Sequence, residues 1–183
     1  MIRVFDILFS MLGLIGLSPI MLLVWLLGWI DTRAPLFRQQ RVGRNQQPFV
    51  LVKFRTMRPD TASVASHLAD ASAITPLGRF LRRTKLDELP QLWNVLCGDM
   101  SLVGPRPNLF NQEDLINARE PLGVYSVRPG ITGLAQIKDI DMSTPELLAK
   151  TDAEMISTIS VANYFKYIFL TVTGKGQGDR VRR

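Results

Sequence analysis

The sequence predicts an α+β fold that is mostly helical, with a small β-hairpin or sheet, and three observations predict it. An apolar stretch from Ile7 to Ile30 contains no charged residue. Two short runs of β-type residues, at 35–39 and 49–54, are separated by a turn that is rich in Gly, Asn and Pro. Much of the remaining chain carries apolar residues at helical spacing.

The composition limits the size of the fold and the class of partner. A chain of 183 residues can form one domain with a hydrophobic core, and two full domains would be cramped. Lys and Arg outnumber Asp and Glu by 22 to 16, so the net charge is +6. This surplus favours anionic partners such as phosphates or lipid headgroups. Nucleic acid is disfavoured because the chain has no aromatic stacking platform and no recognisable nucleic-acid-binding motif.

The counts of cysteine and histidine exclude two kinds of site. One cysteine, Cys97, cannot form an internal disulfide, and together with the one histidine, His67, it cannot build a His/Cys metal cage. We expect Cys97 to be a small buried residue, and we assign no role to His67. Any bound metal would be a hard cation that carboxylates and substrate phosphates hold.

The apolar stretch from Ile7 to Ile30 is long enough to cross a bilayer as a straight helix. It lacks the cleavage site of a signal peptide, and the arginines that follow it place this end in the cytoplasm by the positive-inside rule. Ser18-Pro19 interrupts the stretch, because proline removes a backbone donor and can bend a helix. Two arrangements remain open, a kinked span and a helix that dips in, bends and returns to the same face.

Helices are predicted in the rest of the chain. Apolar residues recur at helical spacing between Leu77 and Leu96, and further helices are predicted at 107–119 and 145–157, the latter beginning at Pro145. In the last helix an apolar stripe either packs on the core or lies on the membrane surface. The stripe comprises Phe165, Ile168, Phe169 and Val172.

Two adjacent acids stand out in "RRTKLDELPQLWNVLCGDMSLVGPRP". Asp87 and Glu88 follow three cationic residues, and we expect a helix to start near Asp87, because Pro90 is tolerated only in a first turn. The positive end of the helix dipole and the neighbouring cations would favour ionised carboxylates. An ionised Asp can act as a nucleophile, and a second carboxylate can act as a general base or help to hold a cation. Taken alone, such a pair is more often a helix cap.

Several cations are held in ways that suggest a role beyond surface ion pairs. Lys53 and Arg55 occupy alternate positions of a predicted strand and therefore lie on one face. Arg106 stands between two prolines, which restrict its backbone, and Arg128 stands in a similar Gly/Pro context. With Arg82 and the two acids, these cations would suit a diphosphate substrate with Mg²⁺. For each arginine on its own, a surface ion pair is the commoner explanation.

Taken together, these motifs resemble the bacterial sugar transferase family, the monotopic phosphoglycosyl transferases. The matching pieces are the apolar segment with "SP", then "KFRTM", "LRRTKLDELPQLWNVLCGDMSLVGPRP" and "RPGITGLAQ", which cover about residues 2–136. The long central motif is highly specific. The segment after Gln136 departs from the family, because "IKDIDMSTP" stands where many relatives have an Asn-Gly-Arg stretch, and only Lys138 could replace the basic residue there.

The resemblance implies a function. Such enzymes move a phosphosugar from a UDP-sugar to a polyprenyl phosphate, usually undecaprenyl phosphate, and release UMP as the first membrane step of O-antigen, capsule or exopolysaccharide synthesis. It implies that Asp87 is the nucleophile and contacts Mg²⁺, and that Glu88 helps to deprotonate the lipid phosphate. The cations implied in phosphate binding are Lys53, Arg55, Arg82, Arg106 and Arg128.

The resemblance also implies an arrangement at the membrane. It favours a re-entrant helix at 1–31, broken at Ser18-Pro19, then a membrane-interface catalytic domain at 32–173 with interfacial amphipathic helices, and a polar tail at 174–183. The location would be the cytoplasmic face of the bacterial inner membrane, in contact with its lipid, and a homodimer is possible. The alternative is a non-catalytic, membrane-anchored basic module that docks on anionic lipid. A glycosyl transferase that releases UDP is a further alternative.

Overall fold

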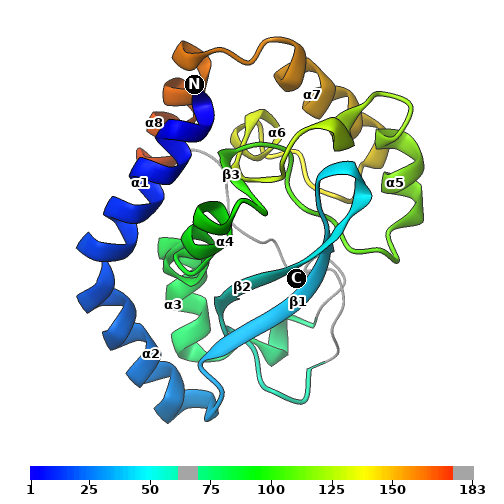
Figure 1. Ribbon diagram of the computed structural model, residues 1–183. Coiled ribbons are helices and arrows are strands. Elements are labelled where there is room, and N and C mark those ends of the chain that lie inside the picture. Colours follow the sequence, from blue (N-terminus) through cyan, green and yellow to red (C-terminus); the bar gives the residue numbers. More distant parts are fainter. Residues whose placement is uncertain (62–69, 175–183) are drawn as a thin grey trace.

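The computed structural model describes residues 1–61 and 70–174, and its mixed, mostly helical architecture agrees with the sequence prediction. Helices α1 (Ile2–Gly16) and α2 (Ser18–Thr32) run along one edge of the molecule (Figure 1). Helices α3 (Pro76–Thr84) and α4 (Gln91–Cys97) lie beside them, and α5 (Glu113–Arg119) and α7 (Pro145–Ser157) lie on the opposite side. The predicted polar tail lies outside the described residues from 175 onward, as does His67.

The N-terminal pair of helices is bent at the position that the sequence indicates. Within the described residues no single helix is long and apolar enough to cross a membrane, whereas α1 and α2 together meet that test and are bent by 62°. Pro19 lies in the first turn of α2, where its missing N–H costs little, and Ser18 Oγ donates to the Ile15 carbonyl at 2.7 Å. The bend therefore has a local cause in Ser18-Pro19.

Helix α1 turns its polar residues inward. Its buried residues are Asp6 and Ser10, whereas most of its large apolar side chains are exposed. Asp6 Oδ1 accepts hydrogen bonds from Ser101 Oγ at 3.0 Å, from the Leu102 amide at 2.9 Å and from the Tyr164 hydroxyl at 2.9 Å. Burial and the Asp6 carboxylate both raise the pKa of Tyr164. Helix α1 is thus attached to the rest of the protein by a buried carboxylate.

A β-hairpin follows the helical pair. Strands β1 (Leu36–Val42) and β2 (Pro48–Phe54) pair antiparallel, with Phe37 opposite Lys53, and a short 3-10 turn η1 (Arg44–Gln46) joins them. The predicted runs at 35–39 and 49–54 are confirmed and slightly extended. Phe49 and Leu51 pack with Val95 and Met100 in one core cluster, so the hairpin is fixed against α4.

The chain between residues 70 and 97 is helical but broken. The 3-10 turn η3 (Ala71–Ala73) precedes α3, which Thr75 caps by accepting a hydrogen bond from the Gly78 amide. Helix α3 ends at Lys85, whose φ of 59° lies in the left-handed region, and the 3-10 turn η4 (Leu86–Glu88) leads into α4. The predicted helix near Asp87 therefore exists as η4 followed by α4, with Pro90 at the start of α4.

Two glycines bring distant segments into direct backbone contact. Strands β3 (Ser101–Val103) and β4 (Gly130–Thr132) pair in parallel, and the Gly130 amide donates to the Pro105 carbonyl at 2.8 Å. A Cβ on Gly130 would lie 2.0 Å from the Gly104 nitrogen, so no other residue fits at this approach. The "GPRP" and "RPG" motifs are therefore neighbours in space.

The C-terminal third completes the fold. It contains the 3-10 turn η5 (Val124–Ser126), α6 (Leu134–Ile137), the predicted helix α7, and α8 (Val161–Val172). The helix predicted at 107–119 begins only at Glu113, because Pro107 and Asn108 belong to an extended segment whose contacts are described below. The apolar stripe of α8 faces mostly outward, since Phe165, Phe169 and Val172 are exposed while Tyr164 and Tyr167 are buried.

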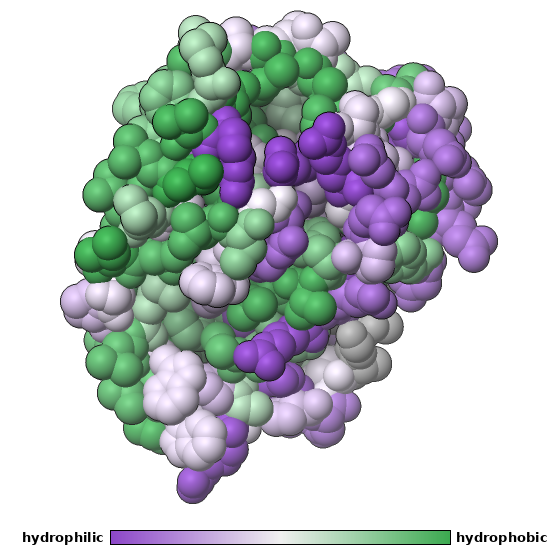
Figure 2. Space-filling view, in the orientation of Figure 1, coloured by the Kyte–Doolittle hydropathy of each residue, from purple (hydrophilic) through white to green (hydrophobic). Residues whose placement is uncertain are grey.

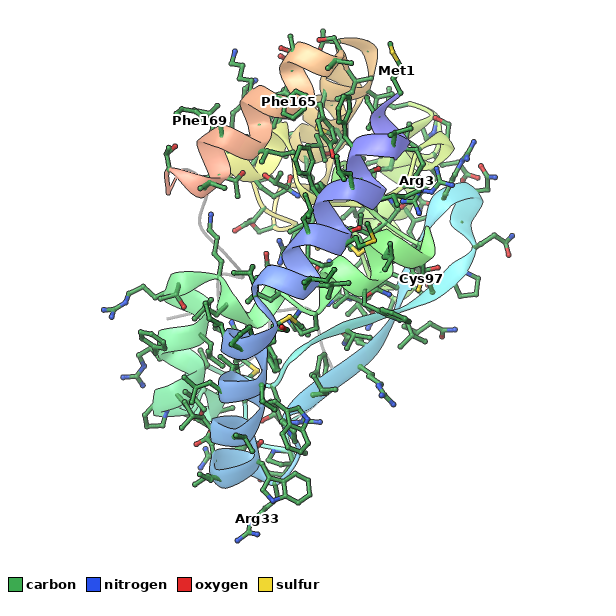
Figure 3. All side chains as sticks on the ribbon, turned by 60° about the vertical axis from the view of Figure 1, so that its left-hand side comes forward. Met1, Arg3, Arg33, Cys97, Phe165 and Phe169 are labelled. Carbon is green, nitrogen blue, oxygen red and sulfur yellow. The ribbon has the colours of Figure 1, made fainter. Side chains whose placement is uncertain are left out.

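Exposed apolar side chains gather on the edge formed by α1, α2 and α8. Figure 2 shows this edge as a largely hydrophobic band on the left of the molecule, with a few paler side chains between the green ones, and Figure 3 turns it forward. Phe165 packs edge-on against Phe5 and Phe9, with ring centroids 5.1 and 5.9 Å apart, whereas Phe169 is 67% exposed. So large an exposed apolar surface is typical of a protein that contacts a membrane or a partner.

Candidate active site

The two acids lie together in a buried turn. Asp87 and Glu88 occupy η4, where they are 3% and 9% exposed, and the left-handed residue Lys85 turns the chain sharply just before them. The N-cap of η4 is Lys85, so neither acid occupies the cap position, which is the common structural role of such a residue. Adjacent buried carboxylates are costly unless cations and hydrogen bonds surround them.

Arg106 supplies one such cation. Its Nη2 donates to Glu88 Oε1 at 3.1 Å, across 18 positions of sequence, and both side chains are largely shielded from solvent. The prolines on either side of Arg106 restrict its backbone, and the hydrogen bonds from the Gly104 amide to Thr132 and from the Gly130 amide to Pro105 fix where that backbone lies. The structure therefore brings the "GPRP" arginine to the acid pair, and its role in phosphate binding stays a prediction.

A narrow cavity beside this pair is lined by further polar residues. The cavity has a volume of about 20 Å³, which leaves room for about one water-sized group. It is lined by Arg41, Lys53, Gln91 and Arg106, together with Leu51, Pro107 and Gly130. Lys53 and Arg41 are each only 7% exposed. Arg41 donates to the Pro107 carbonyl at 3.2 Å and to Gln39 Oε1 at 2.6 Å. Several cationic groups thus converge near the paired acids.

Sequence reasoning missed Arg41 and Gln91 as candidate site residues. Arg41 was grouped with the arginines that follow the apolar segment, although its position two residues from Gln39 in a strand puts both side chains on one face. Gln91 comes four residues after Asp87, a spacing that places it on the same side of a helical turn. The alternation of side chains along a strand could have indicated Arg41, and the helical spacing from Asp87 could have indicated Gln91.

Arg55 and Arg82 lie near the end of β2. Arg55 and Lys53 both approach the Phe37 ring, at 5.5 and 5.7 Å from its centroid, which confirms that they share a face. Arg55 also donates to the Ala34 and Leu36 carbonyls, at 2.9 and 3.3 Å, so it fastens the start of the hairpin. Arg82 Nε donates to Thr56 Oγ1 at 2.9 Å.

Arg128 lies apart from the other predicted cations. Its Nε donates to the Gly98 carbonyl at 2.7 Å, just past the C-terminal end of α4, whereas Asp87 and Glu88 precede the start of that helix. Arg128 lines a second, larger cavity of about 250 Å³ that does not include the paired acids. The structure therefore brings Lys53 and Arg106 toward the acid pair and places Arg128 elsewhere.

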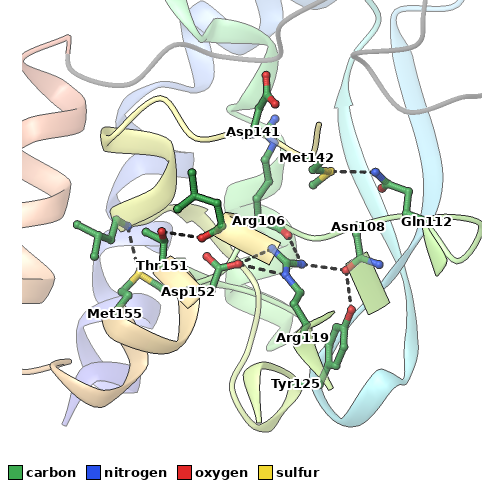
Figure 4. A network of polar contacts seen from close by, with 12 residues as sticks. Arg106, Asn108, Gln112, Arg119, Tyr125, Asp141, Met142, Thr151, Asp152 and Met155 are labelled. Atoms are coloured by element: carbon green, nitrogen blue, oxygen red, sulfur yellow. Dashed lines mark hydrogen bonds and ion pairs between the residues drawn. The ribbon is translucent and has the colours of Figure 1, made fainter. Parts of the chain in front are cut away.

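A buried network holds the segment that carries Arg106. Arg119 donates to Asp152 Oδ2 at 2.7 Å through Nη2 and at 3.1 Å through Nε, and to the Arg106 carbonyl at 2.9 Å (Figure 4). Asn108 Oδ1 accepts from both Arg119 and the Tyr125 hydroxyl. Burial raises the pKa of Asp152, and the Arg119 guanidinium opposes this shift. Helices α5 and α7 are thereby joined under the "PRPN" segment.

The segment that departs from the family also reaches this region. Figure 4 shows the Asp141 carboxylate pointing toward the Arg106 side chain. Lys138, the candidate replacement for a basic residue of relatives, instead pairs with Glu154 at 3.2 Å on the surface.

The expectation that Cys97 is buried is wrong: Cys97 is exposed, because it comes two residues after buried Val95 on α4 and so faces the opposite way.

The donor set fits a magnesium ion that substrate oxygens complete. Among the described residues, no group of three or more His, Cys, Asp or Glu side chains lies close enough to form a metal site. Asp87 and Glu88 offer carboxylate oxygens, which are the ligands that Mg²⁺ prefers, and Mg²⁺ commonly binds through one or two carboxylates plus substrate phosphates. Asp87 is the residue that the family resemblance implies would hold it, and Glu88 beside it is paired with Arg106.

Comparison with known proteins gives a consistent result. The model of the family described as bacterial sugar transferase matches residues 1–176. The chain is 40% identical to a UDP-glucose:undecaprenyl-phosphate glucose-1-phosphate transferase of Caulobacter vibrioides, over 93% of this chain and 67% of that protein. It is 38% identical to the exopolysaccharide production protein PSS of Rhizobium leguminosarum bv. phaseoli, over 91% and 87%. It is also 38% identical to the undecaprenyl-phosphate galactose phosphotransferase of Salmonella typhimurium, over 78% of this chain but 34% of that longer protein.

Proposed function

The chain belongs to the bacterial sugar transferase family, and from that premise we propose that it transfers a sugar 1-phosphate from a UDP-sugar to undecaprenyl phosphate. The observation that carries the proposal is the buried Asp87-Glu88 pair in contact with Arg106, beside a cavity lined by Lys53. Relatives whose names state this reaction with glucose or galactose support it. The sugar that this chain uses is open.

The proposed first step is attack by the Asp87 carboxylate on the β-phosphorus of the donor. A bond forms between an Asp87 oxygen and that phosphorus, and the bond from the phosphorus to the bridging oxygen breaks, so UMP leaves with the electron pair. Lys53 and Arg106 would bind the phosphate oxygens at the mouth of the narrow cavity, which is too small to hold a diphosphate. Mg²⁺, when bound, supplies charge neutralisation of the diphosphate.

The proposed second step transfers the phosphosugar to the lipid. Glu88 accepts the proton of the lipid phosphate, whose oxygen then attacks the phosphorus held on Asp87. The Asp87–phosphorus bond breaks, which regenerates the carboxylate and gives polyprenyl diphosphate-sugar. Arg106 would hold Glu88 in place, because the two side chains are paired at 3.1 Å. Arg55 and Arg82 would hold the end of β2 in position.

The apolar edge supports a proposed location at the cytoplasmic face of the inner membrane. A helical pair bent by 62°, with exposed apolar residues on both arms, suits a re-entrant segment that leaves both ends on one side. A soluble UDP-sugar and a lipid phosphate could then meet at one interface. The homodimer that the resemblance implies stays a prediction.

The nucleotide that the reaction releases tests this function. Purified protein in nanodiscs would receive undecaprenyl phosphate, Mg²⁺ and one UDP-sugar at a time. With the matching donor we expect at most one UMP per chain when the lipid phosphate is absent, and repeated turnover that releases many UMP per chain when it is present. Release of UDP would mean that the acceptor attacks the sugar carbon, which contradicts the roles given to Asp87 and Glu88. No release with any donor would favour the membrane-anchored basic module.

A further inference from the structure

We propose that the cavity of about 250 Å³ at the N-terminal end of α1 binds a phosphate group that carries an apolar tail. This cavity, here named the α1 cavity, is separate from the paired acids. Its apolar walls are Ile2, Val103, Met155, Ile156 and Ile159, and its cations are Arg3, Arg44 and Arg128. In Figure 2, hydrophilic side chains gather at a hollow in the surface beside the upper part of the hydrophobic band.

The three arginines are held in place by backbone carbonyls. Arg3 donates to the Val95 carbonyl at 2.6 Å and to the Leu96 carbonyl at 3.0 Å, both at the end of α4. Arg44 Nε donates to the Ser126 carbonyl at 2.9 Å, and Arg128 Nε donates to the Gly98 carbonyl at 2.7 Å. Arginine side chains anchored in this way lose less freedom when they bind a ligand.

The side chains of Arg3 and Arg128 both approach Gly98. A Cβ on Gly98 would lie 3.4 Å from Arg3 Nη2, and the carbonyl of the same Gly98 accepts the Arg128 Nε–H. Like charges that line one cavity repel each other, and a bound anion relieves this repulsion. The carbonyls at the end of α4 offset only part of this repulsion, because they carry partial charges.

No acid in the described part of the chain neutralises the three arginines. None of Arg3, Arg44 and Arg128 forms an ion pair with a described carboxylate, and the terminal nitrogens of Arg44 and Arg128 make no hydrogen bond to a described residue. Asp6 also lines the α1 cavity, but its single carboxylate faces three arginines and forms hydrogen bonds to neutral groups. The cavity therefore keeps a positive surplus and free donors.

Charge complementarity and the apolar walls together define the ligand. Arginine donors match phosphate oxygens, which accept charge-assisted hydrogen bonds. A bare phosphate would leave five apolar side chains without a contact, whereas an acyl or prenyl tail would cover them. The cavity lies beside the first turn of α1, where Met1 and Val4 are exposed, and a lipid could enter there. The ligand can come from the bilayer, as an anionic phospholipid, or from a polyprenyl phosphate.

Lipid binding measured by native mass spectrometry tests the α1 cavity. The full chain in detergent, stripped of lipid, would be titrated with phosphatidylglycerol, with diacylglycerol and with inorganic phosphate. We expect one phosphatidylglycerol per chain, at least tenfold tighter than either control. Arg44→Gln and Arg128→Gln should each weaken binding about tenfold, since each removes a charge-assisted contact. Arg38→Gln, an exposed arginine outside the cavity, is the charge-matched control and should change binding less than twofold.

Three results would overturn the proposal: equal weakening by Arg38→Gln, no preference for phosphatidylglycerol over diacylglycerol, or equal binding of inorganic phosphate. Competition by undecaprenyl phosphate for the same site would support it and identify the acceptor as the source, and a lack of competition would support a bilayer phospholipid. Thermal denaturation would check that Arg128→Gln folds. If it does not, Arg44→Gln still tests the cavity, because Arg44 is exposed and its replacement should leave folding intact. Asp87→Asn should bind phosphatidylglycerol as the wild type does, so this test is independent of the proposed transferase reaction.

Discussion

At the scale of the residue, the central feature is that two carboxylates are buried where a helical turn would usually expose them. Asp87 and Glu88 follow Lys85, whose left-handed backbone ends α3 and turns the next residues inward. The 3.1 Å contact with Arg106 compensates the burial of Glu88. Such an arrangement is costly to maintain and suits a site that needs its acids in fixed positions.

Replacement of Arg106 should affect activity strongly. In Arg106→Gln, Glu88 loses its cation, and the donor phosphate loses a proposed binding group. We expect sugar-phosphate transfer to fall by about 100-fold, the usual effect of removing one stabilising donor. UMP release per chain measures this change, with Arg38→Gln as a control of equal charge. A rate within twofold of the wild type for Arg106→Gln would contradict the role given to Arg106.

A second residue-scale prediction concerns the buried pair Arg119–Asp152. Both side chains are almost fully buried, at 1% and 0% exposure, so Asp152→Ala would leave an unpaired charge inside the protein. We expect the free energy of unfolding to fall by about 3–5 kcal/mol. Urea denaturation in detergent measures it. Glu154→Gln removes a surface pair from the same helix and should cost less than about 1 kcal/mol. Equal losses for the two variants would rule out a supporting role for the buried pair.

At the scale of the element, α1 and α2 differ from an ordinary amphipathic pair. Helix α1 buries Asp6 and Ser10 and exposes leucines and isoleucines, which is the reverse of a helix in water. Sequence patterns could locate the break at Ser18-Pro19, but they left open which way the arms point. The hydrogen bonds of Asp6 tie α1 to β3 and α8, and this tertiary contact is invisible to a local pattern.

Removal of the break should change the topology. Pro19→Ala restores a backbone donor and a good helix former at the bend, which favours a straighter helix long enough to span a bilayer. We expect an N-terminal epitope tag to be inaccessible to protease from the periplasm in the wild type and partly accessible in Pro19→Ala. Protease treatment of spheroplasts measures this. Full protection in both proteins would contradict a bend set by proline, and periplasmic exposure in the wild type would contradict a re-entrant segment.

At the scale of the whole molecule, the sequence predicted helices, strands and the adjacent acids better than it predicted which residues line the same cavity. The acid pair, the hairpin and α7 are visible locally, and the "GPRP" motif indicated a preorganised Arg106. Arg128 looked equivalent to Arg106, because both stand in Gly/Pro motifs that lie side by side across Gly104 and Gly130. Only the three-dimensional arrangement shows that they line different cavities.

Other features depended on long-range contacts for the same reason. The helix predicted at 107–119 starts late, because Asn108 and the Arg106 carbonyl are engaged by Arg119. The stripe of α8 could have faced the core or a membrane, and the buried hydroxyl contact of Tyr164 with Asp6 decides that it faces outward. The apolar stripe of α8 does not by itself show whether the protein core or a membrane covers it.

The central claim is that Asp87 is the nucleophile, and intact-mass spectrometry tests it most directly. The full chain in nanodiscs, with Mg²⁺ and the donor sugar but without lipid phosphate, should gain the mass of one sugar phosphate. The adduct should map to Asp87, be absent in Asp87→Asn, and disappear when undecaprenyl phosphate is added. Normal turnover by Asp87→Asn, or an adduct on another residue, would contradict the account.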